Sequence, residues 1–129
     1  MAFGTATVLT SAGKAITTNR IKGAGTEPLY VGVGVGATGA ARTAVVGDTA
    51  LSTAVESRVA GTSTQQTTTV TNDTYQVVGT VTATASRAVD EAGLFDASSA
   101  GNMYLSATFP VVNLSSGDSI QATLKVQYS

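Results

Sequence analysis

Strict alternation of apolar and polar residues is clearest near the C-terminus. From Ser119 onward every second residue is apolar, and the apolar set is Ile120, Ala122, Leu124, Val126 and Tyr128. A period of two is typical of a strand with one buried face, so this segment is predicted to be a half-buried strand. Residues 115–118 before it supply a turn, because glycine tolerates positive φ and aspartate can bond to its own backbone.

Two further strands are expected just upstream of this one. An apolar run from Met103 to Val112 leads into the turn, and a polar break at residues 96–102 precedes that run. Leu94 and Phe95 end the strand before the break. This order of runs and breaks predicts a meander of three strands joined by two polar turns over residues 89–129.

The upstream half also contains strand patterns. Residues 5–9 have β composition and end at a break over residues 11–14. Residues 29–36 alternate between aliphatic residues and a face with three glycines, which lets another backbone or a bulky side chain approach closely. In residues 74–85 the alternation returns, and it predicts a long half-buried strand.

Other segments fit more than one structure. Residues 15–22 fit a helical turn or a second strand, and the Thr-rich residues 59–70 fit an exposed strand or a long hairpin loop. Residues 48–56 are the best helical candidate. Asp48 could cap the first amides of a helix of one or two turns.

Together these patterns predict an all-β fold: a single antiparallel β-sandwich or jelly-roll-like domain with at most one short helix.

A chain of 129 residues is long enough for one domain and too short for two. We expect that domain to span residues 1–129, with residues 1–28 forming an N-terminal arm and first strand that contact neighbours. The N-terminus lacks a basic region followed by an apolar one, and the apolar stretches fall far short of the roughly 18 residues of a membrane span. A soluble protein without a membrane partner is therefore expected.

Composition narrows the function classes further. Charged residues make up 12% of the chain and the formal net charge is -1, so the clustered Lys and Arg that bind nucleic acid are missing. Low charge also weakens repulsion between molecules, which favours a component of an assembly. Without His or Cys, the usual nucleophile–base pairs and thiolate metal sites are excluded. We predict no catalytic residue, no cofactor and no metal.

One glycine-rich motif has to be weighed against this prediction. Residues 34–39 match the pattern G-x-G-x-x-G of dinucleotide-binding proteins. That motif requires a helix to begin there, so that its amides face a pyrophosphate, followed by a crossover to a parallel strand. The sequence after it is too short for such a unit, so we interpret the glycines as structural.

Carboxylates near the meander are interpreted as anchors. Asp90, Glu91 and Asp96 could hold a hard cation, but their spacing fits no calcium loop. A salt bridge or a backbone hydrogen bond explains them better, and a buried Glu91 would need an arginine, with Arg58 and Arg87 as candidates. The structural anchor candidates are Glu91, Asp96, Arg58, Asp48 and Phe95.

Short motifs in both halves of the chain resemble a recurrent module of tailed-bacteriophage virion proteins. The downstream motifs are residues 91–96 (EAGLFD), 101–104 (GNMY), 107–109 (ATF) and 117–118 (GD), and the upstream motifs are residues 30–34 (YVGVG), 48–51 (DTAL), Glu56 and Arg58. The resemblance spans roughly residues 8–128. In this group such modules occur as small capsid decoration (cement) proteins and as parts of tail or fibre proteins, and they are not known as enzymes.

The resemblance implies a capsid decoration protein, expected to be homotrimeric, that clamps subunits of the major capsid protein. It would be made in the host cytoplasm and located on the capsid surface of the virion. The brevity of the chain favours this over a fibre, and a tail or tail-fibre-associated host-attachment component is the alternative. A glycan-binding module that uses the Ser/Thr-rich face, and a small glycan hydrolase that uses Asp90 or Asp96, also stay open.

Overall fold

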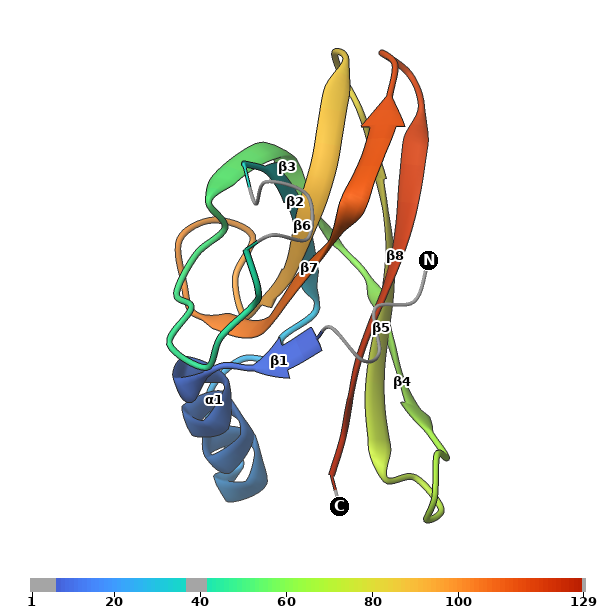
Figure 1. The fold of residues 1–129 in the computed structure, drawn as a ribbon. Helices are drawn as coiled ribbons and strands as arrows, with labels where there is room; N and C mark the ends of the chain where they lie inside the picture. Colours follow the sequence, from blue (N-terminus) through green and yellow to red (C-terminus); the bar gives the residue numbers. More distant parts are fainter. Residues whose placement is uncertain (1–6, 37–41, 129) are drawn as a thin grey trace.

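Two antiparallel sheets and one helix form the part of the chain that this computed structural model describes, residues 7–36 and 42–128 (Figure 1). The elements are β1 Thr7–Leu9, α1 Ser11–Lys22, β2 Tyr30–Val35, β3 Thr53–Ala60, β4 Thr62–Gln66, β5 Thr74–Thr82, β6 Arg87–Phe95, β7 Met103–Leu114 and β8 Ser119–Gln127. The larger sheet has the order β1-β7-β6-β2-β3, and the smaller sheet has the order β4-β5-β8. The predicted all-β sandwich is confirmed.

A row of aliphatic side chains crosses the whole larger sheet. The register places Leu9 beside Leu105, Leu105 beside Leu94, Leu94 beside Val31, and Val31 beside Val59. Paired residues of neighbouring strands point to the same face, so this row forms one wall of the core. Leu105, Leu94 and Val31 are completely buried.

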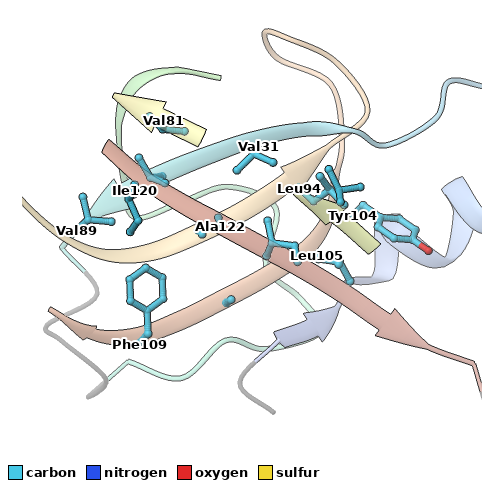
Figure 2. Packing of buried hydrophobic residues seen from close by; sticks show 14 of the residues in the cluster. Val31, Val81, Val89, Leu94, Tyr104, Leu105, Phe109, Ile120 and Ala122 are labelled. Atoms are coloured by element: carbon cyan, nitrogen blue, oxygen red, sulfur yellow. The ribbon is translucent and has the colours of Figure 1, made fainter. Parts of the chain in front are cut away.

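The smaller sheet covers this row. Its strand β8 buries Ile120, Ala122 and Leu124, which are the apolar positions of the period-two pattern. Figure 2 shows β8 passing across the larger sheet, with Leu94 and Leu105 lying close to it. Residues of both sheets belong to one hydrophobic cluster, so burial of apolar surface between the sheets is the main stabilising contribution.

Gly79 of β5 sets the distance between the two sheets locally. A Cβ at this position would lie 2.7 Å from Cγ2 and 3.0 Å from Cβ of Val31 in the other sheet. We expect Gly79→Val to lower the free energy of unfolding by about 1–3 kcal/mol through overpacking, measured by urea denaturation. Gly47→Val is the matched control, because nothing lies within 4 Å of a Cβ there. An equal loss in both variants would contradict this role of Gly79.

The predicted meander has the right strands and one wrong pairing. β6 and β7 pair as expected, and the turn at residues 115–118 forms, with the N–H of Asp118 donating to Ser115 O at 2.9 Å and Gly117 at φ 90°. However, β8 pairs with β5 in the smaller sheet instead of with β7. The other edge of β7 is taken by β1, and β8 buries its apolar face by crossing over the core.

The helix was predicted in the wrong place. Residues 48–52 form a loop, and residues 53–60 form β3, whose Val55 and Val59 pack against the core. The helix is instead α1, which begins after Thr10, whose hydroxyl accepts from the N–H of Gly13 at 2.9 Å. It ends at Gly23 in the left-handed conformation, at φ 86°. Hence the predicted break at residues 11–14 is a helix N-terminus.

The structure resolves the segments that fitted two readings. Residues 15–22 are helical within α1, and residues 59–70 contain the end of β3, the strand β4 and part of a tight loop. Within the expected N-terminal arm, β1 pairs with β7 and α1 packs on β7, while contacts with neighbours stay a prediction. Residues 5 and 6 of the first predicted strand, and residues 37–39 of the glycine motif, lie outside the described residues.

Candidate functional site

Glu91 is a fully buried carboxylate on the face of β6 that points away from Leu94. It accepts hydrogen bonds from Arg42 Nη2 at 3.2 Å and from the backbone N–H of Thr53 at 3.1 Å. A Cβ on Gly34 of the neighbouring strand would lie 2.5 Å from Glu91 Oε1. The glycine face of residues 29–36 therefore admits a bulky side chain, as predicted.

Arg42 connects Glu91 to Asp48. Its Nη1 donates to both carboxylate oxygens of Asp48 at 3.3 Å, and Asp48 also accepts from Ser106 Oγ at 2.7 Å and from the N–H of Val45 at 3.1 Å. Burial by itself would raise the pKa of Asp48, but these hydrogen bonds and the arginine charge outweigh it and lower the pKa. This network ties the loop around residues 42–52 to β6 and β7.

Arg58 and Phe95 form a second contact on the same face of the larger sheet. The guanidinium carbon of Arg58 lies 3.5 Å from the centroid of the Phe95 ring, within cation–π range. Its Nη1 donates to the carbonyl oxygens of Ala97 at 2.9 Å and Ala100 at 2.7 Å. Burial lowers the pKa of Arg58. Its side chain thereby fastens the loop between β6 and β7 to β3.

Asp96 stabilises the same loop from within. Its carboxylate accepts from the backbone N–H of Asn102 at 2.7 Å and from the side-chain amide of Asn102 at 3.3 Å. Asp90 and Glu91, the other members of the predicted carboxylate trio, belong to β6 itself. Among residues 7–36 and 42–128, no three His, Cys, Asp or Glu side chains lie close enough together to hold a metal ion.

Arg87 pairs with Glu56 at the far end of the larger sheet. Arg87 Nε donates to Glu56 Oε1 at 2.8 Å, and Glu56 also accepts from the N–H and the hydroxyl of Thr84 at 3.1 and 2.8 Å. The hydrogen bond from Arg87, followed by those from Thr84, lowers the pKa of Glu56. Glu56 has φ 63°, in an irregular stretch of β3, so a strained backbone accompanies this contact.

The predicted partner of Glu91 was therefore wrong. Arg58 and Arg87 both have other partners, and the arginine that reaches Glu91 is Arg42. Asp48, predicted as a helix cap, instead accepts hydrogen bonds from Arg42 within a loop. No local pattern in the sequence distinguishes Arg42, because it reaches Glu91 through the fold of a loop.

A groove with a volume of about 450 Å³ lies between α1 and the smaller sheet. Its walls include Thr17, Arg20 and Ile21 of the helix and the side chains of Tyr75, Tyr104 and Tyr128. Figure 1 shows α1 and the β4–β5 hairpin reaching toward the same end of the molecule. The groove could not be predicted from the sequence, since a helical turn was only one of two alternatives for residues 15–22 and the tyrosines lie far apart in the chain.

The tyrosines of the groove form one contact network. The rings of Tyr75 and Tyr104 meet edge to face, with centroids 5.9 Å apart. Hydroxyls of Tyr104 and Tyr128 share a hydrogen bond, Thr17 Oγ1 lies 2.8 Å from the Tyr128 hydroxyl, and Tyr75 donates to the carbonyl oxygen of Pro28 at 2.8 Å. Burial raises the pKa of both Tyr75 and Tyr104, so both keep their protons at neutral pH.

The outward face of the smaller sheet is rich in hydroxyl and amide groups. It forms a shallow hollow of about 530 Å³ whose lining includes Thr62, Thr64, Gln76, Thr80 and Gln121. Lys125 follows Thr64 and Gln76 in one cross-strand row, and it adds a charge to this face. Such a surface can donate and accept many hydrogen bonds.

Asp73 holds the loop between β4 and β5. Its carboxylate accepts from the N–H groups of Thr68, Thr69 and Val70 at 2.9, 3.0 and 3.0 Å, and from Gln127 Nε2 at 2.9 Å. The backbone hydrogen bonds from Val70 and Thr68 are the main reason that the pKa of Asp73 is far below its ordinary value of 3.8.

We expect the amides of Thr68, Thr69 and Val70 to lose protection in acid. Because the pKa of Asp73 is lowered in the folded state, its stabilisation is complete above the ordinary value of 3.8 and is lost as the pH falls toward the folded value. Hydrogen exchange corrected for intrinsic rates measures this. Asp73→Ala should remove the protection of these three amides at neutral pH. Asp118→Ala, which acts in another turn, should leave it intact, and persistent protection in Asp73→Ala would contradict the assignment.

Comparison with protein-family models, with curated proteins and with solved structures finds no significant match for this chain. The resemblance to phage virion proteins therefore stays a prediction from short motifs. Within the described part of the chain, no helix combines the length and hydrophobicity needed to cross a membrane.

Proposed function

We propose that this chain is a structural protein that decorates a repeated protein surface, specifically a capsid decoration protein of a tailed bacteriophage that binds the major capsid protein as a homotrimer. The motifs at residues 30–34, 48–51 and 91–96 support the phage assignment by resemblance. The geometry supports the more general part of the proposal, a rigid scaffold that offers shallow contacts.

The observation that carries the proposal is that the charged side chains are used to hold the scaffold together. Carboxylates accept hydrogen bonds from within the chain at Glu27, Asp48, Glu56, Asp73, Glu91, Asp96 and Asp118. Three arginines, Arg42, Arg58 and Arg87, likewise bond to other parts of the chain. These contacts fix loops on the two sheets, and they engage most of the charged side chains within the fold.

A rigid and weakly charged exterior suits a decoration protein. Each contact with a shell can be modest, because many copies on a repeating lattice gain stability through multivalency. Binding that is restricted to the assembled shell stabilises that shell by mass action. No chemical step is required of the decoration protein.

Binding to empty shells tests the proposal. Purified protein is mixed with expanded shells assembled from the major capsid protein of the same phage, and bound protein is quantified after sedimentation. We expect saturation at a copy number comparable with the number of capsid subunits. Absence of binding, or saturation at a few copies per shell, would overturn the proposal. Sedimentation velocity of the free protein tests the homotrimer. A monomer at the protein concentration of the binding assay would contradict the trimeric state.

A second candidate is a tail or tail-fibre component that contacts host glycans. The hydroxyl- and amide-rich face of the smaller sheet favours it, since Thr62, Gln76 and Gln121 can exchange hydrogen bonds with sugar hydroxyls. Immunogold labelling of virions separates the two candidates. Labelling over the whole head supports decoration, and labelling confined to the tail supports attachment.

A further inference from the structure

The second half of α1 and the link that follows it form a continuous exposed segment. Every residue from 18 to 26 is exposed, and the side chain of Ile21 is 82% exposed. Before this segment Gly13 and Ile16 of α1 are buried, and after it Pro28 is buried. A segment with few buried contacts and an exposed backbone has the features of one that opens locally, without unfolding of the whole domain.

The hydrogen bonds of this segment are local. Thr18 Oγ1 donates to the carbonyl oxygen of Ala15 at 3.1 Å, and Arg20 Nη1 donates to the carbonyl oxygen of Gly25 at 3.0 Å. Within the part of the chain that the structure describes, no hydrogen bond joins residues 18–26 to either sheet. Attachment of the segment to the sheets therefore depends on the residues at its two ends.

Tyrosine hydroxyls hold both ends of the segment. At the first end, Thr17 Oγ1 lies 2.8 Å from the hydroxyl of Tyr128, which in turn shares a hydrogen bond with the hydroxyl of Tyr104. At the second end, the hydroxyl of Tyr75 donates to the carbonyl oxygen of Pro28 at 2.8 Å. Hence the exposed segment spans the distance between two fixed points.

The hydroxyls of Thr17, Tyr104 and Tyr128 form a chain of hydrogen bonds, which we call the clasp. Each hydroxyl carries one proton. An order in which Tyr104 donates to Tyr128 and Tyr128 donates to Thr17 leaves the proton of Thr17 for the carbonyl oxygen of Gly13, at 3.1 Å. Tyr128 directly follows β8, and its N–H donates to the carbonyl oxygen of Asp73 at 2.9 Å. The clasp thereby joins α1 to the smaller sheet.

We propose that residues 18–26 are a lid over the groove between α1 and the smaller sheet, and that the clasp keeps this lid closed. Ile21 of the lid forms part of the groove wall, so opening of the lid widens the groove. Tyr128 is 44% exposed, so water can replace the hydrogen bonds of the clasp when the lid opens. The lid is a conformational device that does not depend on the role in decoration.

Hydrogen exchange tests the lid. Tyr128→Phe removes a hydroxyl and keeps the ring, and we expect it to speed exchange of the amides of residues 18–22 about three- to tenfold, the effect of losing one hydrogen bond. The amides of Val31 and Leu94 in the core should exchange as before. Tyr30→Phe is the matched control, because Tyr30 belongs to β2 and is not part of the groove wall. Unchanged exchange in residues 18–22, or equal acceleration in the core, would overturn the inference.

A double-mutant cycle tests the clasp itself. Thr17→Val keeps the shape of the side chain and removes its hydroxyl, so it should speed exchange of the same amides by a similar factor. The double variant with Tyr128→Phe should exchange within about twofold of the faster single variant, because both changes remove the same hydrogen bond. Factors that multiply in the double variant would show that the two hydroxyls act independently, and this result would overturn the clasp.

Discussion

Replacing Arg42 with methionine is expected to lower the free energy of unfolding by about 3 kcal/mol, because it leaves a buried carboxylate without its counter-charge. Glu91 is 0% exposed, and among the described residues the N–H of Thr53 would be its remaining donor. Glu91→Gln should cost only about 1 kcal/mol, since glutamine still accepts from Thr53. In Glu91→Gln, Arg42 would still form its ion pair with Asp48. Its side chain is 30% exposed, so water can also solvate the guanidinium group. Urea denaturation measures both changes.

A double-mutant cycle separates the pair from its surroundings. Arg42→Met combined with Glu91→Gln should cost less than the sum of the two single changes, because no uncompensated charge then stays buried. Arg20→Met is the control, as an exposed arginine whose loss should change stability little. If Arg42→Met proved milder than Glu91→Gln, the network would not depend on the burial of Glu91.

Leu94→Ala is expected to lower the free energy of unfolding by about 3 kcal/mol. Leu94 is fully buried in the centre of the row that crosses the larger sheet, between Leu105 and Val31, so the remaining side chains can fill the cavity only in part. Val111→Ala provides the control, because Val111 is 44% exposed.

Urea denaturation of Leu94→Ala should give a lower midpoint with an unchanged slope, since the mutation removes packing without changing the surface exposed on unfolding. A loss below about 1 kcal/mol would mean that the core collapses around the smaller side chain and that the row is not tightly packed.

The strands were predictable because burial of one face of a strand produces an alternating pattern in the local sequence. In β8 and β5 every second residue faces the core, and the period of two follows directly from that geometry. Pairing is not local. β8 pairs with β5, which lies far from it in the chain, and part of the free edge of β7 pairs with β1, a strand of three residues. Neither pairing leaves a pattern in the local sequence.

The helix could not be predicted from periodicity. Only Gly13 and Ile16 of α1 are buried, so no apolar stripe marks it. Its position is set by the cap at Thr10, by the left-handed Gly23 and by the close approach of Gly13 to β7. In residues 48–56 the helical propensity was real but weaker than the gain from packing Val55 into the core.

Several residues of the candidate site could be predicted from the sequence, but the contacts between them could not. Asp96 and Phe95 were among the predicted anchor candidates, and each contacts another part of the chain. Their role as anchors stays a prediction that stability measurements can test. Arg42 reaches Glu91 through the fold of a loop. The tyrosines of the groove meet beside α1, a helix that hydrophobic periodicity does not mark.

The pairing of β1 with β7 and of β5 with β8 has a consequence for the kinetics of folding. Thr7 pairs with Ala107, and Val81 pairs with Ile120, so much of the structure joins segments that are distant in the chain. Loop closure must precede these contacts, which places folding in the range of milliseconds to seconds. Leu94 and its neighbours can be covered only after residues 119–127 have left the ribosome, so we expect the core to stay open until that strand has emerged.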